Sequence, residues 1–111
     1  MPALRFAHCR LRPAELLDVD LAGAHFDDVS LARAHVTDAN LTKINVTDAN
    51  ARQSVWTDVD FSGARFRDVN LSRARLTSVN LRGVKIADAD IRGLTIDGVR
   101  IDLLLARARR R

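Results

Sequence analysis

The sequence is poor in the residues that build disulfide-bonded folds and aromatic binding sites. Among its 111 residues it has one cysteine, one tryptophan, two prolines and no tyrosine. A single cysteine, Cys9, gives neither a disulfide framework nor a cysteine-rich metal site. It stands at a small position that we expect to face inward, so we expect a buried, inert thiol. No apolar run approaches the roughly 18 residues of a membrane span, and the first residues do not resemble a signal peptide. We therefore expect a cytoplasmic protein that does not enter a membrane.

The positive charge of the chain is concentrated at one end. The formal net charge is +4 and the calculated isoelectric point is about 10.5. Four of the 18 Lys and Arg residues stand in the last five positions, which leaves 14 basic and 14 acidic residues in the rest of the chain. The high isoelectric point thus reflects an Arg-rich tail in part, and the body of the protein is neutral.

A five-residue repeat fills most of the sequence. From Val59 to Arg75 it reads VDFSG, ARFRD, VNLSR, AR, with a small or β-branched residue, a polar one, a large apolar one and two more polar ones in each block. The first three positions alternate like a strand and the last two suit a turn. A period of five drifts around a 3.6-residue helical turn and leaves no apolar stripe. Three-residue strands are unstable alone, so the blocks must stack into a solenoid with both apolar positions pointing inward.

Blocks such as Ala39–Lys43 (ANLTK) and Val69–Arg73 (VNLSR) resemble the pentapeptide-repeat family, and the likeness extends over about residues 4 to 103. The resemblance implies an all-β fold, a right-handed quadrilateral parallel β-helix of about five coils with four blocks per coil. We expect this β-helix to occupy residues 1–103, with an irregular N-terminal coil at 4–23. Residues 104–111 are expected to form a short C-terminal cap and the Arg-rich tail.

The large apolar residues, spaced by five from Phe6 to Ile101, are the predicted inward centres of the blocks. Trp56 is large for such a position and Ala51, one block earlier, is small. Either the two compensate in the core, which we expect because packed cores tolerate swaps that conserve volume, or Trp56 turns outward and Val55 inward to form a binding patch.

The turn positions of the blocks predict two kinds of corner. Glycine at the second turn position, as in Gly23, Gly63 and Gly83, predicts type II turns on the side that ends each coil. Aspartate holds that position on two alternate sides, and we expect another turn type there.

Residues twenty apart should stack along the axis, and this places one arginine per coil near one corner. The candidate binding residues are Arg12, Arg33, Arg52, Arg73 and Arg92. Two interpretations stay open. The arginines can be a solvated side paired with nearby aspartates, or a site for an acidic partner or a phosphate backbone.

Catalytic chemistry finds no support in the sequence. His8, His25 and His35 do not fall together, and the aspartates form columns that suit turns instead of a paired cluster. No Ser-His-Asp context and no Gly-rich phosphate loop is present. We expect a protein that is not an enzyme and needs neither metal nor cofactor.

The favoured function is a rigid protein-interaction module whose partner the sequence does not name. The resemblance adds an alternative, because some pentapeptide-repeat proteins mimic DNA, bind DNA gyrase and confer resistance to topoisomerase poisons such as quinolones. Those mimics are strongly acidic, and this chain is not. Direct binding of nucleic acid through the arginine column is a further alternative, not favoured because no outward aromatic platform is evident. The resemblance also implies a homodimer through the C-terminal end, with Leu103, Leu104 and Leu105 as the candidate interface.

Overall fold

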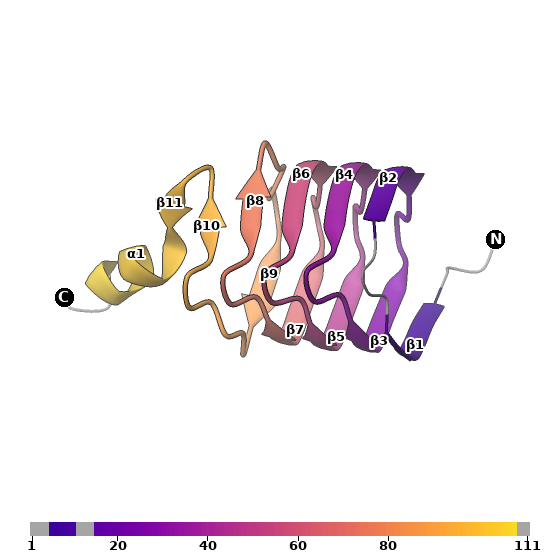
Figure 1. The fold of residues 1–111 in the computed structure, drawn as a ribbon, viewed down its shortest axis with the longest axis horizontal. Coiled ribbons are helices and arrows are strands. Elements are labelled where there is room, and N and C mark those ends of the chain that lie inside the picture. Colours follow the sequence, from indigo (N-terminus) through magenta and orange to yellow (C-terminus); the bar gives the residue numbers. More distant parts are fainter. Residues whose placement is uncertain (1–4, 11–14, 109–111) are drawn as a thin grey trace.

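The computed structural model describes residues 5–10 and 15–108, and it shows a β-solenoid that ends in a helix (Figure 1). The rod measures 46 × 26 × 25 Å. The predicted all-β, four-sided solenoid with a short C-terminal cap is confirmed. One strand from each turn enters each of two sheets. The chain completes about four turns where about five coils are predicted, because residues 99–108 leave the coil path to form an antiparallel strand and a helix.

The first sheet is parallel and contains β1 (Arg5–Arg10), β3 (His25–Ser30), β5 (Asn45–Asn50), β7 (Arg65–Asn70) and β9 (Lys85–Ala87). The second contains β2 (Glu15–Asp20), β4 (His35–Asn40), β6 (Val55–Asp60), β8 (Arg75–Thr77) and β10 (Thr95–Ile96). A last strand, β11 (Val99–Arg100), pairs antiparallel with β10, and helix α1 (Ile101–Ala108) follows it directly.

Every parallel pair joins residues twenty positions apart, as the repeat predicts. Phe26 lies beside Val46, and Val46 beside Phe66. In the first coil, Phe6 pairs with Phe26 and their rings stack with centroids 4.9 Å apart. Part of the coil predicted to be irregular, residues 11–14, lies outside the described residues, as does the side chain of Cys9. The described strands of that coil keep the regular register.

The strands differ from prediction in length, because most of them have six residues and not three. In β3 the buried side chains are Phe26 and Val29, three positions apart, whereas a straight strand would alternate every two. Between them Asp28 has a φ of 55°, in the left-handed region that Asp tolerates better than most residues. Each six-residue strand is thus two predicted short strands joined at a corner, which is an aspartate in β2 to β7 and His8 in β1.

The other two corners are type II turns. The sequence predicts them only on the side that ends each coil, and the structure has them on the opposite side as well. At each, the N–H of the fourth residue donates to the carbonyl of the first, as from Ala24 to Leu21 at 3.0 Å and from Ala74 to Leu71 at 3.1 Å. The third residue has a positive φ, 76° at Gly23 and 59° at Arg73. The Asn or Asp just before the turn accepts the N–H two residues on, as Asn70 does from Ser72 at 2.9 Å, and this explains the polar second position of each block.

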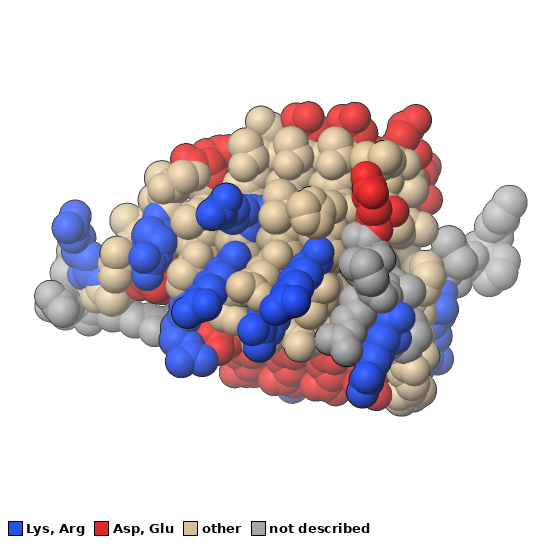
Figure 2. Space-filling view, in the orientation of Figure 1, with Lys and Arg blue, Asp and Glu red and all other residues tan. Residues whose placement is uncertain are grey.

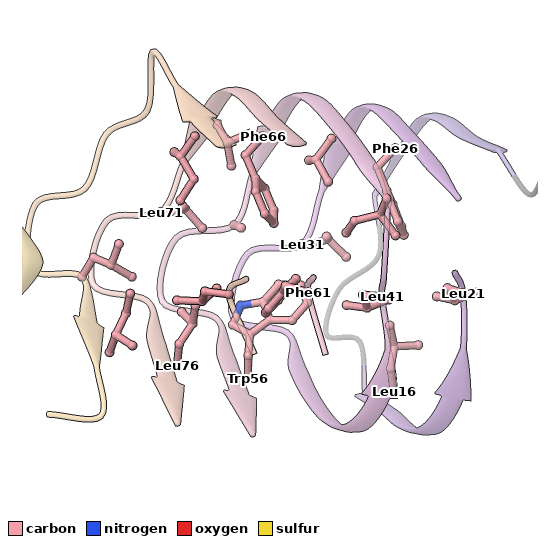
Figure 3. Close-up of a pocket in the computed structure, with 18 residues that line it drawn as sticks. Leu16, Leu21, Phe26, Leu31, Leu41, Trp56, Phe61, Phe66, Leu71 and Leu76 are labelled. Atoms are coloured by element: carbon pink, nitrogen blue, oxygen red, sulfur yellow. The ribbon is translucent and has the colours of Figure 1, made fainter. Parts of the chain in front are cut away.

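The core is a continuous apolar column along the axis (Figure 3). Two predicted inward centres near its C-terminal end differ from expectation. Ile86 is 44% exposed, because β9 is the last strand of its sheet and no later coil covers it. Ile101 begins helix α1 instead of forming a fifth-coil strand, and it still packs against the core.

Trp56 lies in the core, 5% exposed beside the buried Ala51, so the predicted compensation is confirmed. Its indole packs against Phe61, with ring centroids 5.3 Å apart. Its Nε1–H donates to Ser54 Oγ at 2.6 Å, and the Ser54 hydroxyl donates to the Ala51 carbonyl at 2.6 Å. The one polar group of the tryptophan is therefore satisfied inside an apolar column.

Candidate anion-binding surface

The aspartate corners and the type II corners give the rod four distinct edges. Positions 28, 48, 68 and 88 line one edge with aspartate, and positions 18, 38 and 58 line the diagonally opposite one. Between them runs a type II corner that we call the arginine edge, formed by residues 32–33, 52–53, 72–73 and 92–93. Figure 2 shows a face with blue Lys and Arg side chains between red upper and lower margins.

The structure brings four of the five predicted arginines to this edge, all of them exposed: Arg33, Arg52, Arg73 and Arg92. Arg12 lies outside the described residues. The arginines alternate between the two turn positions from coil to coil, so that each position carries an arginine only in every second coil. Arginines in the same column are thus about 10 Å apart, twice the strand spacing, which weakens the repulsion that a straight ladder would create.

Neighbouring polar residues support the edge. Gln53 follows Arg33 in the same column, and its Oε1 accepts a hydrogen bond from Arg33 Nε at 3.2 Å. Within residues 5–10 and 15–108, no carboxylate lies within 4.0 Å of the guanidinium of Arg33, Arg52 or Arg73. Pairing with a nearby aspartate, the first interpretation of the column, is therefore made by Arg92 alone among these four.

An open hollow of about 810 Å³ adjoins the C-terminal part of the arginine edge. We call it the arginine hollow. Its lining residues are Gln53, Val55, Arg73, Arg75, Arg92, Gly93, Thr95, Arg100 and Asp102. Sequence reasoning did not include Arg75 or Arg100 in the site. The twenty-residue register, which stacks Arg75 between Val55 and Thr95, was the signal for Arg75.

Two of the four arginines in the hollow are held by carboxylates. Arg92 forms a two-point bond with Asp90, at 3.1 Å from Nε and 2.8 Å from Nη2. This hydrogen bonding lowers the pKa of Asp90, with a further contribution from the Arg92 backbone N–H, and raises the pKa of Arg92. The charge of Arg92 is therefore paired with that of Asp90, although the arginine side chain itself stays exposed.

Arg100 is held in the same way by Asp102, at 2.9 Å from Nε and 2.8 Å from Nη2. Asp102 Oδ2 also accepts the backbone N–H of Gly93 at 3.1 Å. The Arg100 bonds and then the Gly93 bond lower the pKa of Asp102 well below its ordinary value, and the pKa of Arg100 is raised. Asp102 thus ties the first turn of α1 to the last turn of the arginine edge.

Arg73 and Arg75 are the two free cations of the hollow. In the described part of the chain, neither guanidinium has a carboxylate within 4.0 Å. Both side chains are exposed, on either side of the fully buried Ala74, and both line the hollow. An anion entering the hollow would meet two unneutralised guanidinium groups.

The predicted C-terminal interface is exposed on helix α1. Leu103, Leu104 and Leu105 are 60%, 52% and 38% exposed, and Val99 on β11 is 50% exposed. The helix begins at Ile101, three residues before the expected start of the cap. No helix of the described residues is long and apolar enough to span a membrane.

The described residues form neither a cluster of catalytic or metal-binding side chains nor a cavity large enough for a buried ligand. The histidines stay apart, with His8 paired to Asp28 at 2.8 Å between Nδ1 and Oδ2. In residues 5–10 and 15–108, no three His, Cys, Asp or Glu side chains come together in a way that could hold a metal ion. The core encloses about 40 Å³ between apolar side chains (Figure 3), far less than a ligand pocket of roughly 300 Å³ or more.

A two-sheet parallel solenoid with twenty-residue coils defines a class of repeat protein, and comparison with known families confirms it. The pentapeptide-repeat model matches in eight copies, over residues 5–42, 14–53, 44–83 and 57–93. The chain belongs to the pentapeptide-repeat family.

Two solved structures of similar proteins share the fold. A pentapeptide repeat protein of the Arabidopsis thaliana thylakoid lumen is 18% identical, with 95% of this chain and 75% of that one covered and a TM-score of 0.76. One from Nostoc PCC 7120 is 26% identical, with 85% of each chain covered and a TM-score of 0.55. QnrB1, a plasmid-mediated fluoroquinolone resistance protein, is 18% identical over 93% of this chain and 67% of its own, at a TM-score of 0.27 that supports no functional argument. None of the curated proteins matches.

Proposed function

We propose that this protein is a non-catalytic, rigid interaction module that binds an anionic surface of a protein partner along the arginine edge. The observation that carries the proposal is the row of exposed arginines, of which Arg33, Arg52 and Arg73 lack a carboxylate partner among the described residues. Exposed guanidinium groups that no carboxylate of the described residues engages are available to bond the oxygens of an acidic partner. A filled core and coil-to-coil backbone hydrogen bonds hold the backbone of the arginine edge rigid.

Affinity capture from a lysate of the source organism tests this proposal. The test variant carries Arg33→Gln, Arg52→Ser and Arg73→Gln, which are residues that the same columns already hold at Gln53 and Ser72. A partner bound by the wild type and released by the variant supports the proposal. Retention of the same partners by both proteins, or no partner for either, contradicts it.

Nucleic acid is a second anion that the arginine row could bind. Every described aromatic side chain lies in or against the core, so bases would find no stacking platform. Binding would then rest on phosphate contacts and weaken steeply with salt. A gel shift without a complex at low salt excludes this alternative.

Mimicry of DNA toward gyrase receives less support from the charge pattern. The two aspartate edges supply rows of carboxylates, but the arginine edge runs between them and breaks up the acidic surface (Figure 2). We expect no inhibition or protection of purified gyrase in a supercoiling assay with excess protein.

The exposed leucines of α1 favour self-association as a property of the module. Leu103 and Leu104 are each more than half exposed, which is unusual for adjacent large apolar residues. We expect a homodimer in light scattering of the wild type and a monomer after Leu103→Lys and Leu104→Lys. A wild-type monomer at high concentration overturns this expectation.

We also propose a cytoplasmic location. The one cysteine of the chain cannot form an internal disulfide, which suits a reducing compartment. Fractionation of source cells tests it.

A further inference from the structure

We propose that the arginine hollow is a site for a phosphate monoester group, with Arg73 and Arg75 as its two principal ligands. This inference rests on the proposed interaction function and names the group that the partner presents. The hollow lies where the arginine edge meets the outward face of β6, β8 and β10, so it combines residues from two sides of the rod with Arg100 and Asp102 beyond the last coil.

The charge of the hollow matches a dianion. Four guanidinium groups line it, and two of them are neutralised, Arg92 by Asp90 and Arg100 by Asp102. Two positive charges, on Arg73 and Arg75, remain. A phosphate monoester carries about −1.5 to −2 charge at pH 7, whereas a carboxylate or a phosphodiester carries about −1. The monoester is therefore the group whose charge the free arginines balance.

The walls of the hollow hold the arginines in place. Gly93 lies next to Arg73, and a Cβ built on it would be 3.1 Å from Arg73 Cγ, so the absence of a side chain there lets the arginine stem cross the turn. Gln53 Oε1 is occupied by Arg33, which leaves the Gln53 amide nitrogen as a donor at the hollow. The Thr95 hydroxyl is a further polar group of the lining.

The two held arginines contribute in a different way. Arg92 and Arg100 each bond a carboxylate through Nε and Nη2, so Nη1 and the second proton of Nη2 remain as donors. Guanidinium groups have five donors and suit the several oxygens of a phosphate better than a point charge does. The hollow thus offers donors from several arginines while leaving only two charges to be compensated.

The register of the solenoid supplies matched variants for the test. Arg73→Gln with Arg75→Thr places in the hollow the residues that stand one coil away, Gln53 and Thr95. The control, Arg65→Asn with Arg67→Thr, removes the same charge from β7 and copies Asn45 and Thr47 of the neighbouring strand. In each pair the two arginines are exposed and lie two residues apart in the sequence. A general effect of lost charge on binding would therefore appear equally in both variants.

The experiment is a fluorescence-anisotropy titration of the full chain with a labelled peptide that has one phosphoserine among glycines and serines. We expect the test variant to bind it at least about tenfold more weakly than the wild type, since a hydrogen bond to a charged group contributes about a factor of ten or more. The control variant should retain the wild-type affinity. Equal losses in the two variants, or none in the test variant, would overturn the proposal.

Further ligands identify the group and its source. A peptide with two aspartates in place of the phosphoserine has the same charge, and equal or tighter binding of that peptide overturns the proposal, as does tighter binding of a single-stranded oligonucleotide. Inorganic phosphate is used as a competitor. If inorganic phosphate displaces the labelled peptide at about the same concentration as unlabelled phosphopeptide does, free phosphate is the source of the group. If much more inorganic phosphate is needed, the source is a phosphorylated protein segment. Either result supports a phosphate site.

Failure of this inference can be told apart from failure of the interaction function. If no phosphopeptide binds but a lysate partner is still captured through Arg33 and Arg52, only the phosphate site is wrong. If phosphopeptide binds and no partner is captured, the phosphate site stands and the proposed interaction module is contradicted.

Discussion

The indole of Trp56 donates its N–H to the hydroxyl of Ser54, 2.6 Å away in the middle of the apolar core. Ser54 is fully buried, at a position that other coils fill with residues such as Ala34, Ala74 and Leu94. The serine therefore makes it possible for a tryptophan to occupy a core position without a buried unsatisfied donor.

Substitution Ser54→Ala should lower the free energy of unfolding by about 1–3 kcal/mol, because it leaves the indole N–H buried without a partner. The loss should be much smaller in a Trp56→Phe background, which has no such donor. Urea denaturation of the four proteins of this cycle measures the coupling. Equal losses in the two backgrounds would show that the hydrogen bond does not contribute.

The aspartate edge at positions 28, 48, 68 and 88 predicts that the free energy of unfolding rises with salt concentration. Asp68 stands one coil from Asp48 and one from Asp88, in a column of like charges. Asp68→Asn should raise the free energy of unfolding at low salt by up to about 1 kcal/mol, and the gain should shrink at high salt. Asp68→Ala should instead be destabilising by about 1–2 kcal/mol, because alanine does not tolerate the φ of 54° that the corner requires. Denaturation at two salt concentrations distinguishes the two effects, and an Asn variant no more stable than wild type contradicts the first.

Gly93 and Gly23 form a matched pair for the packing of Arg73. Both have a φ near 75°, but only at Gly93 would an added Cβ approach another side chain within 4 Å. Alanine at either position should cost about 1 kcal/mol or more of stability through the backbone. Only Gly93→Ala should also displace Arg73 and weaken phosphopeptide binding. Binding unchanged in both variants would show that Gly93 does not position the arginine.

The Asp102 carboxylate predicts a loss of stability in acid. Its pKa is lowered in the folded state from an ordinary value of 3.8, so its ionised form stabilises the fold above about pH 4 and this contribution is lost as the pH falls toward the folded-state pKa. Asp102→Asn should be less stable than the wild type at neutral pH, and the difference should narrow below about pH 4. Thermal unfolding followed between about pH 2 and 7 measures it. If the difference in stability between the wild type and Asp102→Asn stays constant over that range, the ionised Asp102 carboxylate does not stabilise the fold.

The candidate site was only partly predictable. The twenty-residue period places Arg33, Arg52, Arg73 and Arg92 on one edge. This could be predicted because every parallel strand pair joins residues twenty positions apart. Arg100 could not be found in this way, since it follows the last regular block and its position depends on the antiparallel pairing of β11 with β10. Nor could counting show that Asp90 and Asp102 neutralise Arg92 and Arg100 and leave Arg73 and Arg75 free.

The sequence by itself determined the solenoid, its register, its inward column and the type II corner that ends each coil, because these follow from a local pattern repeated without a slip. Tertiary structure alone decided the six-residue strands that bend at Asp28 and its equivalents, the exposure of Ile86 at the last coil and the hydrogen bond between Trp56 and Ser54. Those features depend on which groups meet at the corners and at the ends of the rod. A repeat specifies the relation between one coil and the next, but an end has no next coil, and a corner contact depends on the particular side chains that reach it.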